Sequence, residues 1–362
     1  MPLNPLFTQL QLPTTSAAAI REFNERYLAA VGAAVPTGWA DTIGEIIPTD
    51  RPEVTFPISQ MHTLYSRTTG ESRTRKLREA AFSVFAEEWD AGYEAKLQDL
   101  FLKVFAYQQW QKAPARLVLA EEQLRHNQIA LILDGSGTRS TTATQGGVSS
   151  TCVDGQNFFS TSHPANFTDP TVSGTWSNYV STPTNVLGSA AVKNTGTFLI
   201  DALQAQVTAM QTSVLDENGK LIGADPDTIL VPYDYYEPLK NGLANERLVN
   251  FQTNTTSNDV AAAAIANVYK GKFNVVPVKE FTMSTGASAD WYLIDSKLIK
   301  SRFCPPWITL QLNMPGSLAF RVFDESSDYF KETGNIKLSS HVWNGFALAL
   351  PHAIRRIVGP TR

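Results

Sequence analysis

The sequence predicts a protein of the α+β class, in which long helices, a long hairpin and a smaller α/β unit follow one another along the chain. Three observations predict this class. Apolar residues recur at helical spacing in 16–36, 99–135 and 195–216. Strand-like apolar pieces flank a polar tip within 53–89. The stretch 136–187 is rich in Ser, Thr, Gly and Asn, and its apolar residues follow neither helical nor strand periodicity.

The first helix is expected over 16–36, "SAAAIREFNERYLAAVGAAVP". Ser16 is a suitable N-cap, because its hydroxyl can accept a hydrogen bond from an N–H of the first turn. Ile20 and Phe23 then recur at helical spacing, and Pro36 ends the pattern because proline cannot continue a helix. The residues before this helix are polar and interrupted by proline, which predicts an extended arm.

The stretch 53–89 predicts a long hairpin with a charged tip. The polar sequence "TTGESRTRK" contains Gly70, which suits a turn. Four basic residues gather at this tip: Arg73, Arg75, Lys76 and Arg78. Because a two-stranded ribbon is only marginally stable in water, we expect the hairpin to lie on another surface, such as a neighbouring subunit.

Three interpretations of the basic tip are open. It can be a solvated hairpin end, a contact with an acidic patch on a neighbouring copy, or a contact with nucleic acid. No aromatic side chains alternate with the basic ones to stack on bases, which disfavours nucleic acid. Our hypothesis is that the four basic residues pair with carboxylates of the adjacent subunit.

The longest helical signal covers 99–135, where Leu102, Ala106 and Trp110 share one face. Pro114 is expected to kink this helix, and Gly135 to end it. The polar stretch that follows is unusually long for a compact domain. It is either a linker or a loop ordered by contacts outside itself, and its aromatic residues favour an ordered loop.

An α/β unit with a central sheet is expected in the second half of the chain. A helix over 195–216 precedes a strand, turn and helix over 226–246. Strands are expected over 271–281 and 289–299. The closing segment contains several strands, of which "GNIKLSSHVWNGFALAL" at 334–350 is long and two-sided.

Composition narrows the class of function. The chain has 362 residues, 18% of them charged, with a net charge of −4. This mildly acidic balance disfavours a dedicated nucleic-acid binder. Cys152 and Cys304 are far apart and the five histidines are not paired at ligand spacing, so we expect neither a zinc site nor another metal or cofactor. We expect no signal peptide and no membrane span.

The segment "DGQNFFSTSHP" at 154–164 is the best candidate for chemistry. Asp154 and His163 could form an acid–base pair or half of a metal site. The structural interpretation is stronger, because no nucleophile or second histidine lies at a suggestive interval and the known phosphate-loop, dinucleotide, hydrolase and zinc-protease motifs do not occur in the sequence. In that interpretation a turn, two aromatic anchors and a locally bonded histidine hold the loop: Asp154, Gly155, Phe158, Phe159 and His163.

The same segment resembles the "DGxxFF…HP" loop of the major head subunit of Mu-like phages, a family with the HK97-type capsid fold. Three further segments are similar to that family: "ILVPYDYYEPLKNGL", "DWYLID" and "SSDYFKETGNIKLSSHVWNGFALAL". The order of the parts along the chain also resembles that of this fold, with an arm and helix, a long hairpin, a long helix, a glycine-rich loop, an α/β unit and closing strands.

The resemblance implies five regions. They are an N-terminal arm at 1–44, an extended hairpin loop (E-loop) at 45–98, a peripheral domain with a spine helix and glycine-rich loop at 99–199, an axial domain at 200–320, and C-terminal strands at 321–362 that return to the peripheral domain.

The implied function is structural rather than enzymatic. Copies of the chain would form pentamers and hexamers of an icosahedral head that encloses double-stranded DNA, a virion component assembled in the cytoplasm of the bacterial host. The implied partners are the chain itself, portal, scaffold and decoration proteins, and packaged DNA bound without sequence preference, with no membrane partner and no cofactor. The alternative is the shell subunit of an encapsulin-like, non-viral compartment.

Overall fold

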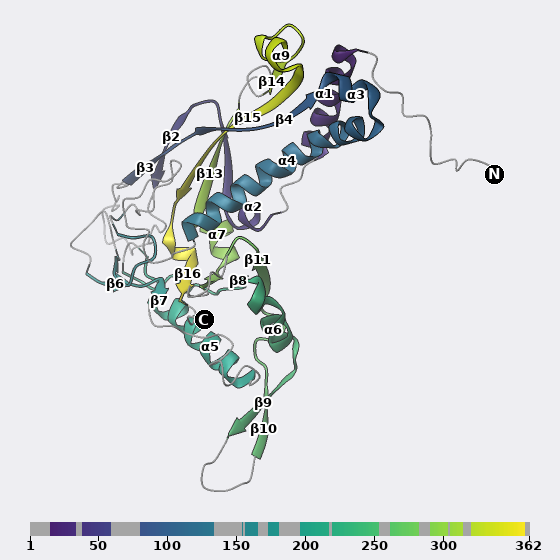
Figure 1. Ribbon diagram of the computed structural model, residues 1–362. Coiled ribbons are helices and arrows are strands. Elements are labelled where there is room, and N and C mark those ends of the chain that lie inside the picture. Colours follow the sequence, from purple (N-terminus) through teal and green to yellow (C-terminus); the bar gives the residue numbers. More distant parts are fainter. Residues whose placement is uncertain are drawn as a thin grey trace, which may run out of the picture.

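The computed structural model confirms the α+β class and divides the molecule between two five-stranded sheets (Figure 1). The structure describes residues 15–33, 38–58, 80–133, 154, 156–165, 173–180, 196–216, 219–252, 261–281, 290–302, 305–313 and 320–358. The first sheet contains β1, β13, β15, β14 and β4, and the second contains β11, β8, β12, β16 and β7.

Strand β15 (Asn335–Leu348) organises the first sheet. It pairs antiparallel with β4 (Glu87–Lys96) along one edge, and with β14 (Phe320–Phe323) and β13 (Trp307–Leu312) along its length. Strand β1 (Glu45–Thr49) lies parallel to β13. The long two-sided strand predicted over 334–350 is therefore present.

Helix α4 (Val104–Leu133) covers one face of this sheet. With 30 residues it is about 45 Å long, and Pro114 lies inside it without ending it. Its Tyr107, Trp110 and Leu117 pack on the sheet residues Ile336 and Leu338. On β4, exposed and half-buried residues alternate, because every second side chain turns towards the helix.

Two predictions about the N-terminal half need correction. Helix α1 (Ser16–Ala33) is present, but its N-cap is Thr15, whose Oγ1 accepts the N–H of Ala18 at 3.2 Å. The signal over 99–135 covers two helices, α3 (Leu97–Leu102) and α4, because Lys103 between them has an extended backbone. Helix α1 lies against α4, where Trp110 donates its indole N–H to the Ala19 carbonyl at 3.2 Å.

The second sheet is buried on both faces. Its strands are β11 (Asn274–Val278), β8 (Thr228–Pro232), β12 (Trp291–Ile294), β16 (Ile354–Ile357) and β7 (Tyr179–Val180). On β12, Leu293 faces α5 (Gly196–Ser213) and α6 (Tyr233–Ala244), while Ile294 faces the side of α4. This explains why the central strands β8 and β12 are mostly apolar along their whole length, which is typical of strands covered on both sides.

The strand predicted over 289–299 is half strand and half helix. Strand β12 ends at Ile294, and α7 (Ser296–Arg302) begins almost at once. Asp295 causes the change, since its Oδ1 accepts the N–H of Leu298 at 2.8 Å and so caps the helix. A second short helix, α9 (Asp328–Thr333), interrupts the predicted closing strands, with Ser327 as N-cap and Gly334 in the left-handed conformation after it.

A shared hydrophobic cluster joins the two sheets. Phe346 and Leu348 of β15 meet Leu230 and Tyr292 of the second sheet, together with Trp39 of α2 (Trp39–Ile43). The Tyr292 hydroxyl donates to the carbonyl of Leu133, at the C-terminal end of α4. The long helix therefore runs from the far end of the first sheet to the second sheet (Figure 1).

Two ribbons extend from this body (Figure 1). One consists of β2 (Glu53–Ile58) and β3 (Ala80–Phe85), and the other of β9 (Arg247–Gln252) and β10 (Ala261–Ala266). Among the described strands, each ribbon is a separate two-stranded sheet. None of the described helices combines the length and the apolarity needed to cross a bilayer.

The contact between α4 and β15 gives a stability prediction. Leu338 is fully buried under α4, whereas Val322, its cross-strand partner on β14, is 37% exposed. We expect Leu338→Ala to lower the free energy of unfolding by about 2–5 kcal/mol, because it leaves a cavity under the helix, and Val322→Ala by less than ~1 kcal/mol. Urea unfolding of the purified subunit measures both, and equal losses would contradict this packing.

Candidate functional site

The loop predicted as the best candidate site lies at the edge of the second sheet. Its described residues form a short ladder in which β5 (His163–Pro164) pairs with β6 (Thr175–Trp176). Asp154 begins it with a local turn, in which its Oδ1 accepts the N–H of Gln156 at 3.0 Å. Gly155, the other predicted turn residue, lies outside the described residues.

The structure brings Asp154 and His163 together. The Asp154 Oδ2 lies 2.7 Å from His163 Nδ1, and the His163 side chain has no exposed surface. The other ring nitrogen lies 3.2 Å from the carbonyl of Phe158 and 3.1 Å from Oδ1 of Asn178. Both nitrogens are therefore engaged inside the protein, and neither is available to a substrate.

The two phenylalanines point into different surroundings. Phe158 is 2% exposed and belongs to the cluster that joins the two sheets. Phe159 is half-buried, with its ring 5.6 Å from that of Tyr292 and 5.7 Å from the guanidinium of Arg356. Arg356 in turn forms a buried ion pair with Asp290. The loop is thus attached to the second sheet through its aromatic side chains.

Asn178 is the residue that the sequence analysis missed in this loop. Its amide nitrogen donates to the Phe158 carbonyl at 2.8 Å, and its Oδ1 accepts the N–H of Ser160 at 2.9 Å. Its carbonyl accepts the N–H of Arg356 at 2.8 Å, which fixes the loop to β16. No signal in the sequence marks this asparagine, because it stands among many similar polar residues of 136–187.

A column of three rings connects the loop to the C-terminal segment. The His163 ring stacks on Trp176 at 4.7 Å, and Trp176 lies 4.6 Å from His352 in the 3₁₀ helix η2 (Pro351–Ala353). Burial, with a smaller contribution from the nearby His163, lowers the pKa of His352 to about 3, while Asp154 and Asp216 oppose the shift. His352 is therefore neutral at physiological pH.

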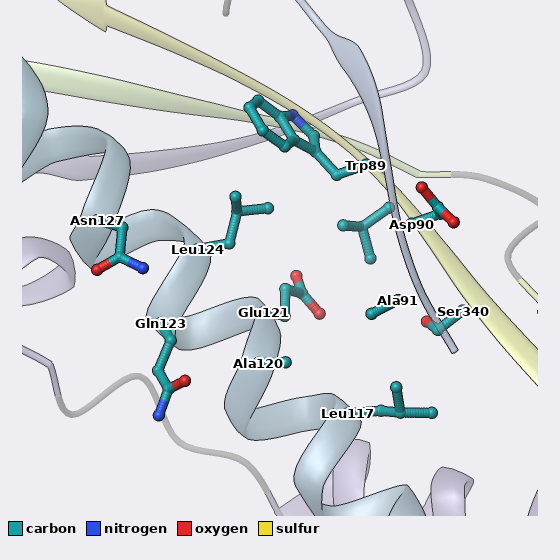
Figure 2. Close-up of a pocket in the computed structure, with 11 residues that line it drawn as sticks. Trp89, Asp90, Ala91, Leu117, Ala120, Glu121, Gln123, Leu124, Asn127 and Ser340 are labelled. Atoms are coloured by element: carbon teal, nitrogen blue, oxygen red, sulfur yellow. The ribbon is translucent and has the colours of Figure 1, made fainter. Parts of the chain in front are cut away.

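A cavity of about 260 Å³ lies between α4 and the first sheet (Figure 2). Leu117 and Leu124 of α4 and Trp89 and Ala91 of β4 form its apolar walls. Glu121 points towards it from the helix, and burial raises the pKa of this carboxyl. The described lining holds no cysteine or histidine, and this chemistry suits packing better than catalysis.

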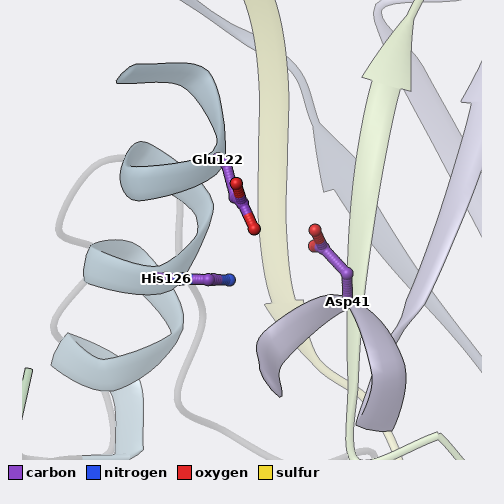
Figure 3. Close-up of side chains that lie close together, drawn as sticks. All are labelled: Asp41, Glu122 and His126. Carbon is purple, nitrogen blue, oxygen red and sulfur yellow. The ribbon is translucent and has the colours of Figure 1, made fainter. Parts of the chain in front are cut away.

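Other potential ligand groups lie along the same stretch of α4. Asp41, Glu122 and His126 place one oxygen or nitrogen donor each within 4.8 Å of one another (Figure 3). The sequence analysis expected no metal site. The available signal was the spacing of Glu122 and His126, which places both on one helix face, but Asp41 is distant in the sequence.

The predicted contact residues Arg73, Arg75, Lys76 and Arg78 lie outside the described residues. The strands that lead to them are described, and they pair in register from Glu53–Phe85 at the base to Ile58–Ala80. The contact of these four basic residues with a neighbouring subunit stays a prediction.

Comparison with known proteins gives likenesses in structure only. No family model matches the chain, and no curated protein matches it. The procapsid of bacteriophage JBD30 matches with 13% identity and a TM-score of 0.43, covering 96% of this chain and 75% of that one. The Mycobacterium phage Bobi structure matches with 12% identity and a TM-score of 0.45, covering 91% and 93%.

A virus-like particle from Pyrococcus furiosus also matches, with 7% identity and a TM-score of 0.45, covering 93% of this chain and 98% of that one. At these values the likeness does not assign a function. The function has to come from the geometry of this chain.

The buried His352 gives a pH prediction. Since its pKa is near 3 when folded and about 6.5 when unfolded, the unfolded state binds more protons between these values, and stability falls as the pH decreases from 6.5 towards 3. This residue should remove roughly 2 kcal/mol of stability between pH 7 and pH 5. We expect His352→Phe, which keeps a ring beside Trp176, to lose less stability between pH 7 and pH 5 than the unchanged protein, as measured by urea unfolding at both pH values. An equal loss of stability in the two proteins would contradict the low pKa of His352.

Proposed function

We propose that this chain is the major capsid protein of a tailed phage, a structural subunit with an HK97-like fold. Copies of it would form pentamers and hexamers that close into an icosahedral shell around double-stranded DNA. Its residence would be the virion, and its assembly would take place in the host cytoplasm. Portal, scaffold and decoration proteins would be its further partners, and DNA would be held without sequence readout.

The observation that carries the proposal is the β2–β3 ribbon. At its base Val84 is 1% exposed and packs on Leu310 of β13 and Ala347 of β15, with Val54 beside them. Thr55 and Ser83, on the other face, are exposed and bond only to each other among the described residues. A two-stranded ribbon of this kind is marginal alone, so contact with a neighbouring copy is the simplest way to stabilise it.

Exposed apolar side chains support the same conclusion. Leu28 of α1, Leu102 of α3 and Phe105 of α4 are 69%, 70% and 71% exposed. Adjacent subunits would cover these side chains.

In this proposal the regions predicted from the sequence take definite roles. The N-terminal arm, 1–44, and the E-loop, 45–98, would reach adjacent subunits in part, since α1 and α2 pack on α4 of the same chain. Helix α4 would be the spine of the peripheral domain, and the second sheet with α5 and α6 would form the axial domain. Among the described strands of 45–98, β2 and β3 form the separate ribbon, and β1 and β4 pair with the first sheet. Within 321–362, β15 belongs to the first sheet and β16 to the second.

The loop 154–164 would serve as an internal anchor. Phe158 enters the cluster between the sheets, and His163 is bonded on both ring nitrogens. Asp154, Gly155 and Phe159 would complete this anchor. A long polar segment would in this way be fixed to the second sheet at a few points.

The basic tip would meet an acidic surface of the neighbour. The exposed face of β4 offers one, because Glu88, Asp90 and Glu94 lie on it, although Glu88 also contacts Arg321 and His341 of its own chain. Attraction between opposite charges would orient the ribbon, and many modest contacts of this kind add up when a shell closes.

Electron microscopy of the purified, overexpressed chain tests the proposal. We expect closed particles of uniform size, or pentamers and hexamers that form them when scaffold is added. A chain that remains monomeric with and without its scaffold, and whose β2–β3 ribbon is protected from proteolysis in the monomer, would contradict it.

An encapsulin-like compartment is the second candidate, because it would need the same subunit contacts. The contents of particles isolated from the native source distinguish the two. Double-stranded DNA indicates a phage head, and a cargo enzyme indicates a compartment.

The basic tip gives a further prediction. We expect Arg73→Glu with Arg75→Glu to reduce particle yield at least ~10-fold, because two attractive contacts per subunit become repulsive. The unfolding temperature of the subunit should not change. Lys297→Glu with Lys331→Glu, at positions 74% and 62% exposed, makes the same change of charge elsewhere and serves as the control. Normal particle yield from the tip variant would refute the contact.

A further inference from the structure

The three donors Asp41, Glu122 and His126 come from two elements that the fold brings together. Glu122 and His126 are one turn apart on α4, and Asp41 lies on α2, which immediately precedes β1 (Figure 3). Figure 3 shows the imidazole pointing from the helix into the space between the two carboxylates. The three groups converge from opposite sides of this space.

His126 has an unsatisfied nitrogen at this position. The residue is 8% exposed, and its Nε2 has no hydrogen-bond partner in the described structure. A buried polar atom without a partner is costly, and a ligand for it would remove that cost.

Gly38 lies directly against this nitrogen, where only a glycine fits. A Cβ at this position would lie 1.7 Å from His126 Nε2 and 3.0 Å from Glu122 Oε1. Both atoms therefore face the same space beside the glycine. Any other residue would place a methyl or methylene group directly against Nε2.

The charge around this space is negative. Asp41, Glu122 and the nearby Glu280 contribute three carboxylates; the Glu280 side chain is 6% exposed, and its Oε1 lies 4.0 Å from His126 Nδ1. The opposing charges are Arg125, which bonds both oxygens of Asp41 at 3.0 and 3.1 Å, and Lys279, 3.6 Å from Glu280. Each Asp41 oxygen retains a second lone pair, so the arginine orients this carboxylate without using it up.

We propose that Asp41, Glu122 and His126 bind one divalent transition metal ion, for which zinc is the best probe. One imidazole nitrogen with two carboxylate oxygens is a donor set of zinc, with a water molecule as the fourth ligand. In a tetrahedral site, bonds of about 2.0–2.2 Å place ligand atoms about 3.3–3.6 Å apart. The observed donors, which lie within 4.8 Å of one another, need to come closer by up to ~1.5 Å. Magnesium and calcium prefer oxygen ligands alone and fit less well.

The ion would join α2 to α4 and so fix the chain between the arm helix and β1. This role is independent of the proposed shell function, because it concerns the stability of a single subunit. It adds a site that neither the loop 154–164 nor the ribbon requires.

Isothermal titration and thermal unfolding of the full-length protein test the site. After treatment with EDTA and removal of the chelator, we expect zinc to bind with a stoichiometry of one per chain and to raise the unfolding temperature by about 3 °C or more. Magnesium or calcium at the same concentration should leave it unchanged. Glu122→Gln, which keeps the shape of the side chain, and His126→Gln should each weaken zinc binding at least ~10-fold.

Glu332→Gln is the control. This exposed residue of α9 makes the same change of charge and is neither a proposed ligand nor a partner of Arg125. It should bind zinc as the unchanged protein does. Absence of zinc binding, or binding that Glu122→Gln leaves intact, would overturn the proposal. In the latter case the zinc would be held elsewhere in the chain, for example by the cysteines. If His126→Gln fails to fold, the comparison of Glu122→Gln with Glu332→Gln still decides the question.

Discussion

The structure depends on the position of one strand, β15. Its 14 residues pair with β4 on one edge and with β14 and β13 on the other, so β4 is held in register with strands from the distant C-terminal part of the sequence. Gly345 permits the closest of these approaches, since a Cβ there would lie 2.2 Å from the Phe85 carbonyl. The ribbon is therefore rooted where β15 is most deeply buried, and a shift of β15 by one residue would exchange its buried and exposed faces.

The long helix transmits this constraint to the second sheet. Helix α4 packs on β15 through Leu117 and on the joining cluster through Ile129 and Leu133. The carbonyl of Leu133, near the C-terminal end of α4, accepts a hydrogen bond from the Tyr292 hydroxyl. A carbonyl of the last turn, which has no partner inside the helix, is therefore bonded to the other sheet. Because one continuous helix spans both bodies, they cannot rotate freely against each other. A rigid subunit of this kind loses less entropy when it assembles.

The sequence predicted those features that depend on local periodicity. The α4 signal, the two-sided strand β15 and the helix α5 were all recognisable, because each places apolar residues at its own regular spacing. The change from strand β12 to helix α7 at Asp295 was missed, because a single capping side chain starts the helix and no change in the spacing of apolar residues marks it. Asn178 was missed for a different reason. Its bonds reach Phe158 and Arg356, and such contacts are set by the tertiary fold.

The candidate sites follow the same distinction. Asp154 and His163 are near in sequence, and their proximity was a reasonable expectation, while the cluster of Asp41 with His126 exists only because α2 returns to α4. The surroundings of His163 and His126 also differ in whether the ring nitrogens are available to a ligand. His163 has partners on both nitrogens and is closed to ligands, whereas His126 retains a free, buried Nε2 beside a glycine. A buried histidine without a bond costs stability unless something binds it, and this imbalance directs attention to α4 rather than to the loop that first suggested chemistry.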